Sequence, residues 1–179
     1  MPASPLLTGR VWKYGDGVNT DVIFPGKYAY TLQDPAEIAS HALEDLDPAF
    51  AAQAQPGDII VAGRNWGNGS SREQAVTCLK YKGVAAIVAV SFARIFFRNG
   101  LNQGLLLITC PALVAAAQTG DTLTIDLNQS CLRLPPADQI YPFPPLSPTA
   151  LSIIEMGGLV PYVRHKLGIT STAEVKMSE

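Results

Sequence analysis

The middle of the chain alternates between short apolar runs and segments with helical signals. Three runs lack polar alternation, as is typical of strands buried on both faces of a parallel sheet: residues 59–63, 84–90 and 105–109. Three segments that follow these runs carry helix start or stop signals: residues 71–82, 91–100 and 111–120. The pattern therefore predicts a strand–helix–strand–helix–strand core, which defines an α/β fold.

Weaker patterns predict further elements on both sides of this core. Strands or hairpins are expected at residues 9–14, at residues 22–24 after a polar turn, and at residues 121–135. Helices are expected at residues 34–46, 149–158 and 159–168, the first with Asp34 as its N-cap. Three segments lack a regular pattern: a loose lead at residues 1–8, an irregular strap with six prolines at residues 135–148, and a frayed tail at residues 168–179. We therefore expect one domain over residues 9–167.

Composition and charge narrow the class of protein. The 179 residues are 47% hydrophobic and 16% charged, which is typical of a folded domain with a sizeable core. The net charge of −2 argues against a nucleic-acid partner, which needs a basic face. Apolar runs stay well below the ~20 residues of a membrane span, and the N-terminus does not have the pattern of a secretory signal. We expect a cytoplasmic protein without a membrane partner.

The metal-ligating residues are few and scattered. The cysteines are Cys78, Cys110 and Cys131, and the histidines are His41 and His165. A self-contained zinc or iron–sulfur site needs three or four ligands, usually with close pairs, and no C-x-x-C pair occurs. We expect neither a disulfide framework nor a metal site in this chain.

One glycine-rich stretch, GRNWGNGSSREQA, begins at Gly63 between a predicted strand and a predicted helix. Ligands bind beyond the carboxyl ends of strands in open α/β sheets, and a helix N-terminus favours anions. Glycines allow the backbone to approach a ligand closely, and Arg72 has a planar fork that suits a carboxylate or phosphate. The stretch therefore indicates an anion site.

A purely structural interpretation of the same stretch is open as well. Ser70 with Glu73, and Ser71 with Gln74, each have the spacing of a capping box, so the serines could simply begin a helix. The P-loop, the dinucleotide fingerprint and the G-x-S-x-G elbow all fail to match, which disfavours a nucleotide site or an esterase.

A second polar cluster, GDGVNTDVI, precedes the first helix. It places Asp16, Asn19, Thr20 and Asp21 in a turn that leads into the apolar residues 22–24. Alone it predicts a turn with Asx caps. A carboxylate exposed there could also orient Arg72 or a substrate hydroxyl.

Three motifs in this order, N-T-D, G-S-S-R-E and S-F-A-R-I, resemble the small subunits of 3-isopropylmalate dehydratase, which are swivelling-domain relatives of aconitase. The resemblance extends from about Gly9 to Leu167. It implies a swivelling β/β/α domain with a mixed sheet and flanking helices. It also implies a hydro-lyase of leucine biosynthesis, active only with a separate large subunit that carries a [4Fe–4S] cluster.

The resemblance also implies roles for individual residues. Ser70 matches the base that takes a proton from the substrate carbon, and Ser71 and Arg72 match residues that bind a substrate carboxylate. Asp21 matches the aspartate of the N-T-D motif and would orient Arg72 or the substrate hydroxyl. The substrate would be a small 2-hydroxy acid with two or three carboxylates.

Substrate choice in this family is linked to the loop that is read here as KYAYT, in which Tyr28 and Tyr30 would contact the substrate. The loop has no arginine for a third carboxylate, which favours an apolar substituent such as isopropyl. Asn68 and Gln74 replace a cysteine and a histidine that are common in bacterial members. A dehydratase for homoaconitate, methylcitrate or a substituted malate, and a non-catalytic anion-binding module of the same fold, are therefore alternatives.

Overall fold

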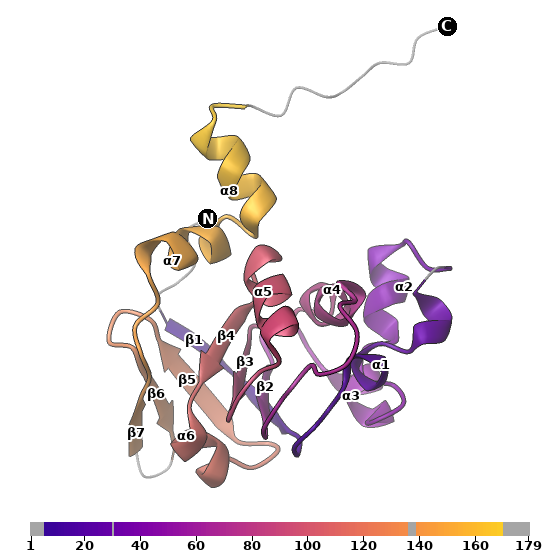
Figure 1. The fold of residues 1–179 in the computed structure, drawn as a ribbon. Coiled ribbons are helices and arrows are strands. Elements are labelled where there is room, and N and C mark those ends of the chain that lie inside the picture. The colour runs from indigo at the N-terminus through magenta and orange to yellow at the C-terminus, as the bar shows by residue number, and fades with distance from the viewer. Residues whose placement is uncertain (1–5, 30, 136–138, 170–179) are drawn as a thin grey trace, which may run out of the picture.

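The computed structural model describes residues 6–29, 31–135 and 139–169 (Figure 1). These residues form a curled seven-stranded sheet in the order β4-β3-β2-β1-β5-β6-β7. The strands are β1 (Leu6–Lys13), β2 (Ile59–Ala62), β3 (Ala86–Ala89), β4 (Leu106–Thr109), β5 (Thr122–Asp126), β6 (Cys131–Leu134) and β7 (Gln139–Pro142). Strands β1 to β4 are parallel, whereas β1, β5, β6 and β7 pair antiparallel. The sheet is therefore mixed, and β1 joins its two halves.

In chain order the helices are α1 (Thr20–Ile23), the 3-10 helix η1 (Gly26–Tyr28), α2 (Pro35–Ser40), α3 (Pro48–Gln53), α4 (Gln74–Tyr81), α5 (Arg94–Asn102), α6 (Pro111–Ala116), α7 (Pro148–Glu155) and α8 (Leu159–Lys166). Helices α1 to α5 cover one face of the parallel half and α6 lies on the other, whereas α8 projects away from the sheet (Figure 1). The core on one face includes buried residues of α1 to α5, and the core on the other includes α6 and strands β5 to β7. None of the helices in the described residues is long and apolar enough to span a bilayer.

The central strands are buried on both faces, as the uninterrupted apolar runs predict. In β2, Ile60 belongs to the core beneath helices α1 to α5, and Ile59 and Val61 belong to the core on the opposite face. All four residues of β2 and all four of β3 are buried. The predicted strand–helix–strand–helix–strand core is therefore confirmed.

The helix expected at residues 34–46 is shorter than the pattern suggested. Asp34 caps it as expected, accepting from the N–H groups of Ala36 and Glu37, but α2 ends at Ser40. Leu43 is fully buried, has a φ of 58° and donates its N–H to the carbonyl of Ile23. Since a positive φ cannot continue a right-handed helix, the chain turns there.

Four other expectations differ from the structure. Helix α3 was not predicted, and residues 20–23 form α1 where a strand was expected after the turn. The proline-rich strap contains β7, which tolerates Pro142 because it is an edge strand of the sheet. Strand β1 begins at Leu6, within the segment expected as a loose lead. Of the expected tail, Gly168 lies in the turn that follows α8 and the N–H of Ile169 donates to the carbonyl of Arg164, whereas residues 170–179 lie outside the described residues.

Candidate active site

The two polar motifs lie against each other, although about 50 residues separate them in the chain. The N–H of Thr20 donates to the carbonyl of Asn68 over 2.7 Å, and the N–H of Gly67 donates to the carbonyl of Val18 over 2.8 Å. Asn19 caps α1 by accepting from the N–H of Val22, so the N-T-D segment begins a helix instead of a strand. These bonds bring the turn after β1 to the loop after β2, beyond the carboxyl ends of two adjacent parallel strands.

Ser70 is the exposed end of this junction, and Thr20 is its buried end. The N–H of Ser70 donates to Thr20 Oγ1 over 3.0 Å, and the two hydroxyl oxygens are 3.2 Å apart. Thr20 is only 1% exposed, whereas Ser70 is exposed. Thr20 Oγ1 already accepts from an N–H, so its own proton is available to Ser70 Oγ. An anionic Ser70 oxygen would therefore have a fixed hydrogen-bond donor beneath it.

The serines do not cap a helix, and the capping-box interpretation is wrong. Helix α4 begins at Gln74, three residues later than expected, and its N-cap is Glu73, which makes no side-chain cap bond. The Glu73 carboxylate accepts from Gln103 Nε2, and Asn99 Nδ2 donates to the carbonyl of Ser71 over 3.2 Å. Residues 70–72 therefore form a loop that is bonded to α5, and neither serine hydroxyl caps the helix.

Arg72 turns toward the other motif. Its Nη2 forms an ion pair with Asp21 Oδ1, which fixes the guanidinium beside the start of α1. Arg72 Nη1 is buried and has no hydrogen-bond partner among the described residues. It lies against Gly26, where an added Cβ would come within 2.9 Å of Nη1. The structure therefore brings together Ser70, Arg72 and Asp21, and leaves donors of the guanidinium unused by the protein.

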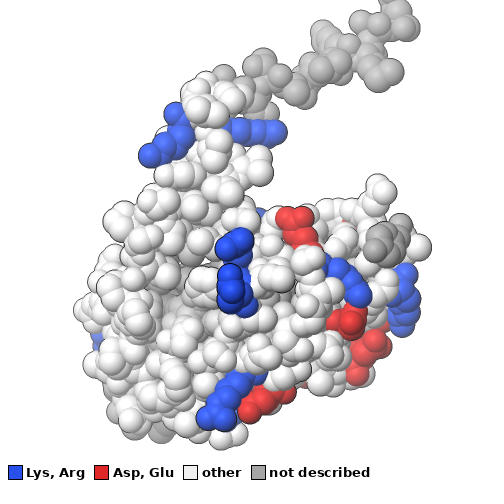
Figure 2. Space-filling model, viewed as in Figure 1, with Lys and Arg blue, Asp and Glu red and all other residues white. Residues whose placement is uncertain are grey.

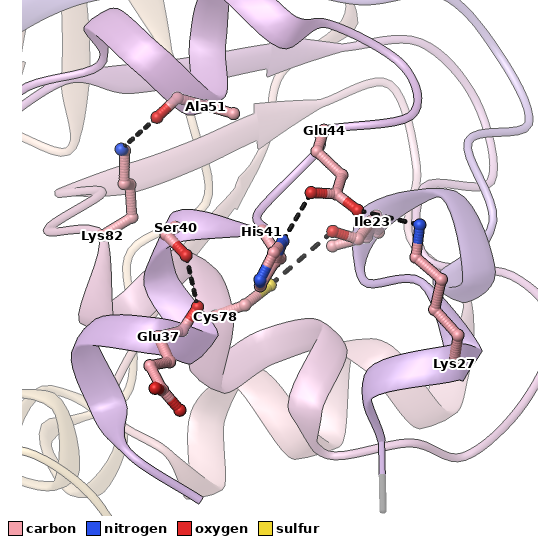
Figure 3. Close-up of polar contacts among 9 residues, drawn as sticks. All are labelled: Ile23, Lys27, Glu37, Ser40, His41, Glu44, Ala51, Cys78 and Lys82. Carbon is pink, nitrogen blue, oxygen red and sulfur yellow. Dashed lines mark hydrogen bonds and ion pairs between the residues drawn. The ribbon is translucent and has the colours of Figure 1, made fainter. Parts of the chain in front are cut away.

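The start of the segment expected to contact the substrate, residues 27 and 28 at the end of η1, is held by a polar cluster that includes His41 and Glu44 (Figure 3). Glu44 bridges His41 Nδ1 at 2.5 Å and Lys27 Nζ at 3.3 Å. The Tyr28 ring stacks on the His41 ring with 3.9 Å between their centroids. Burial alone would raise the pKa of Glu44, but hydrogen bonds from His41, Tyr28 and Lys27 outweigh it and lower that pKa. The Tyr28 side chain is thus engaged within the protein, while Tyr30 lies outside the described residues.

The two departures from the family pattern support the loops. Gln74 Nε2 donates to the carbonyl of Ala29 over 3.2 Å, and Asn68 Nδ2 donates to the carbonyl of Asn65 over 2.9 Å. The nearby Cys78 is fully buried with its thiol 3.7 Å from the carbonyl of Ile23, and burial raises its pKa (Figure 3). A fully buried thiol with a raised pKa is expected to be unreactive.

The described residues contain no group of three His, Cys, Asp or Glu side chains that could hold a metal ion. Cys78 lies in the core beneath helices α1 to α5. Cys110 is buried in the core on the opposite face, and Cys131 is buried at the start of β6. The candidate site itself offers hydroxyl, carboxylate and guanidinium groups.

Three residues that shape the site had no assigned role in the sequence analysis. Thr20 lies inside the N-T-D motif, but only the fold shows that its hydroxyl is buried beneath Ser70. Asn99 and Gln103, which bond the loop from α5, lie where the sequence predicts a helix end and the loop after it. A polar residue at a helix end has a local explanation, so the sequence gave no signal for a contact to a distant loop.

We predict that Thr20→Val weakens the site without unfolding the protein. The substitution keeps the shape of the side chain but leaves the Ser70 N–H without its acceptor and Ser70 Oγ without its donor, a loss of about 1–3 kcal/mol for an unsatisfied polar group. We expect kcat to fall by about 10- to 100-fold. Thr20→Ser should restore most of kcat, because it retains the hydroxyl. A purely structural role would lower thermal stability in both variants and leave kcat per folded molecule unchanged.

Gly67 sets the distance between the loop and α5. Its φ is 76°, and an added Cβ would lie 2.2 Å from Cγ of the buried Phe96. The preceding Trp66 is fully buried, its backbone N–H donates to the carbonyl of Ser91, and its indole Nε1 has no partner within the described residues. Trp66 and Gly67 are therefore closely packed beneath the site, and we call these two residues the floor of the loop.

We predict that Gly67→Ala destabilises the fold by about 2–5 kcal/mol, because it combines an unfavourable φ with overpacking against Phe96. Chemical denaturation of the purified chain measures this change in the free energy of unfolding. Gly120→Ala is the matched control, since Gly120 also has a positive φ (94°) but open space around its Cβ position. Equal losses in the two variants would show that contact with Phe96 contributes nothing.

The sheet order and the paired motifs define an aconitase-type domain, and sequence comparison agrees. The family model described as the aconitase C-terminal domain matches residues 21–113. The chain belongs to this family. Over 163 residues it is 42% identical to the 3-isopropylmalate dehydratase small subunit of Thermodesulfovibrio yellowstonii, covering 91% of this chain and 96% of that protein. Over 157 residues it is 50% identical to the methanogen homoaconitase small subunit of Methanothermobacter thermautotrophicus, covering 87% and 89%.

A solved structure has the same fold. The crystal structure of 3-isopropylmalate dehydratase from Methanocaldococcus jannaschii superposes with a TM-score of 0.85 at 40% sequence identity. The match covers 92% of this chain and 96% of that one. The swivelling-domain fold and the family resemblance inferred from the motifs are thus confirmed.

Proposed function

We propose that this chain is the small subunit of a 3-isopropylmalate dehydratase, a hydro-lyase that interconverts 2- and 3-isopropylmalate. The observation that carries the proposal is the exposed Ser70 hydroxyl above the buried Thr20 hydroxyl, with the Arg72–Asp21 ion pair close by in the chain and the fold. Relatives at 42–44% identity over about nine-tenths of the chain bear the name of this small subunit.

Ser70 Oγ acts as the base in this proposal. It takes the proton from a substrate carbon, and the electron pair of that C–H bond forms the carbon–carbon double bond. The hydroxyl on the neighbouring carbon takes up a second proton, from solvent or a group of the large subunit, and leaves as water. Addition of water in the opposite sense then places the hydroxyl on the adjacent carbon. A serine is a weak base at its ordinary pKa, so its anionic form needs stabilisation. Thr20 Oγ1 at 3.2 Å and the positive charge of Arg72 supply it.

Arg72 and Ser71 bind one substrate carboxylate. The guanidinium is suited to two parallel hydrogen bonds to a carboxylate, and Asp21 fixes its orientation through Nη2. Asp21 is 59% exposed, so it is also accessible to a substrate hydroxyl. Tyr28 and Tyr30 would shape the substrate side of the η1 loop. For Tyr28 we assign this effect to the position of its backbone, because its ring is stacked on His41 and its hydroxyl bonds to Glu44.

The large subunit is the partner that completes the site, and it would carry the [4Fe–4S] cluster. When bound, such a cluster supplies a Lewis acid for the substrate hydroxyl and a carboxylate. This chain contributes the base and a carboxylate site, and the location of the pair would be the cytoplasm.

The test is turnover after anaerobic reconstitution of this chain with a cluster-bearing large subunit from the same organism. The ultraviolet absorbance of the alkene product should rise with 3-isopropylmalate as substrate. Absence of turnover with isopropylmalate, in a complex that forms and contains an intact cluster, would contradict this substrate. Ligand binding by this chain without turnover with any hydroxy acid would instead indicate a non-catalytic anion-binding module.

A homoaconitase small subunit is the second candidate, because a relative 50% identical to this chain bears that name. Homocitrate and homoaconitate, together with citrate and methylcitrate, would therefore be assayed in parallel with isopropylmalate. The ratio of kcat/KM between isopropylmalate and homoaconitate decides between the two, since the chemistry at Ser70 is common to both.

A further inference from the structure

Segment η1 packs against the arginine that is proposed to bind the substrate carboxylate. A Cβ added to Gly26, the first residue of η1, would lie 2.9 Å from Arg72 Nη1 and 3.3 Å from its Cζ, so only bare backbone fits there. Just after η1, the carbonyl of Ala29 accepts from Gln74 Nε2 over 3.2 Å. The position of η1 therefore sets one wall of the space around the guanidinium, whereas Asp21 orients it from α1.

The side chains of η1 converge on one carboxylate, that of Glu44. Lys27 Nζ lies 3.3 Å from this carboxylate, and His41 Nδ1 lies 2.5 Å from it (Figure 3). The Tyr28 hydroxyl also donates to this carboxylate, and the Tyr28 ring stacks on His41. Two consecutive residues of η1 thus share a single anchor, so loss of the Glu44 carboxylate would release both.

The turn that carries Glu44 is itself fixed by the core. The preceding Leu43 is fully buried and bonds through its N–H to the carbonyl of Ile23, the last residue of α1. The same helix carries Asp21, the partner of Arg72. Figure 2 shows acidic and basic side chains next to each other on the side of the molecule where α1 and α2 lie in Figure 1. The turn at Glu44 therefore links the two elements that contact Arg72, namely α1 and η1.

We propose that Glu44 is a positioning residue for the substrate-carboxylate site: it keeps η1 packed on Arg72, so that the site is formed before the substrate arrives. This inference rests on the proposed function, in which Arg72 binds a substrate carboxylate. Glu44 itself does not touch the substrate and acts only through Lys27 and Tyr28. A site that is formed in only a fraction of the molecules binds its ligand more weakly by that fraction. Preorganisation of η1 thus contributes to substrate affinity and not to the chemical step.

We expect Glu44→Ala to raise KM and to leave kcat nearly unchanged. Loss of a hydrogen bond to a charged group is worth about 10-fold in an equilibrium constant, so KM for the hydroxy acid that the complex turns over should rise by about that factor. The value of kcat should stay within about 2-fold of wild type, because the hydrogen bonds between Ser70 and Thr20 do not involve η1. Glu44→Gln, which keeps the size of the side chain but loses its charge, should have a smaller effect of the same sign.

The experiment uses the reconstituted complex with its cluster. Steady-state kinetics give KM and kcat, and calorimetry gives the affinity for succinate, a dicarboxylate with no hydroxyl to eliminate. Tyr28→Phe removes the hydroxyl that bonds to Glu44, so combining it with Glu44→Gln should cost less than the sum of the two single effects. Glu37→Ala is the matched control, because it removes an exposed acid of α2 whose carboxylate forms no hydrogen bond or ion pair within the described residues. It should change neither KM nor succinate affinity.

The outcomes separate this inference from the proposed function. Stronger or unchanged succinate binding in Glu44→Gln would overturn the inference, because removal of a negative charge alone favours an anion, which is the opposite sign to release of η1. A fall in kcat at unchanged KM, or strictly additive effects of Glu44→Gln and Tyr28→Phe, would overturn it as well. A complex that turns over no hydroxy acid but binds succinate in a Glu44-dependent way contradicts the proposed function and leaves the positioning role in place.

Discussion

Ser70→Ala is expected to abolish turnover while leaving the fold and the complex intact. Positioned general acid–base groups contribute about 10²–10⁴-fold to rate, so kcat should fall by about that factor, equivalent to about 3–5 kcal/mol of transition-state free energy. The substitution leaves the backbone N–H of Ser70 bonded to Thr20, because that bond does not use the Ser70 side chain. The loop should therefore keep its conformation, and KM should change little.

The measurement is the initial rate of alkene formation by the reconstituted pair, with cluster content and complex formation checked in each variant. Ser152→Ala on α7 is a matched control that removes a hydroxyl far along the chain from the loop. More than about a tenth of the wild-type kcat in Ser70→Ala would fall outside the range expected for loss of the base, and would assign proton transfer to another group.

Arg72→Lys is expected to cost nearly as much, through substrate binding. Lysine keeps the positive charge but replaces a planar, five-donor fork by a single ammonium group, so two-point binding of a carboxylate is lost. A lysine ammonium also lacks the coplanar N–H donors with which a guanidinium can bond to Asp21 and to a ligand carboxylate at the same time. Loss of one or two charged hydrogen bonds is worth about 2–4 kcal/mol, and we expect kcat/KM to fall by about 10²–10³-fold, mostly in KM.

Steady-state kinetics over a wide range of substrate concentration separates KM from kcat in this variant. Arg133→Lys is the control. Arg133 lies on β6, away from the two motifs, and likewise contacts a carboxylate, that of Asp126, and the side-chain amide of Gln129. A lysine variant with normal KM would show that charge alone suffices at this position and that the fork geometry is not used.

The parallel core was predictable because burial on both faces leaves a local signature. Each residue of β2 and β3 is apolar, so the run itself identifies the strand. The break of α2 was not predictable, because the helical pattern continues past Ser40. The positive φ of Leu43 accompanies burial of its side chain and a hydrogen bond from its N–H to the Ile23 carbonyl, which are contacts with distant parts of the chain. Strand β7 was missed for the opposite reason, since prolines that exclude a central strand are tolerated at an edge.

The site was predictable as a set of residue types but not as a conformation. Both motifs stand out in the sequence, and the fold brings them together. The spacing of Ser70 and Glu73 nevertheless suggested a helix cap that the structure does not contain. A capping box is a local rule, whereas the conformation of Ser70 depends on the Thr20 hydroxyl, 50 residues away in the chain.

The burial of Trp66 gives the loop an intrinsic optical reporter. The chain has only two tryptophans, and they lie in different surroundings: Trp12 donates its indole N–H to Asp58 over 2.7 Å, whereas Trp66 is enclosed in the floor of the loop with its N–H unpaired among the described residues. Indole emission shifts to longer wavelength when water reaches the ring. In a Trp12→Phe background, therefore, the colour of the remaining fluorescence reports whether the floor of the loop stays closed when a ligand or the partner subunit binds, without any added label.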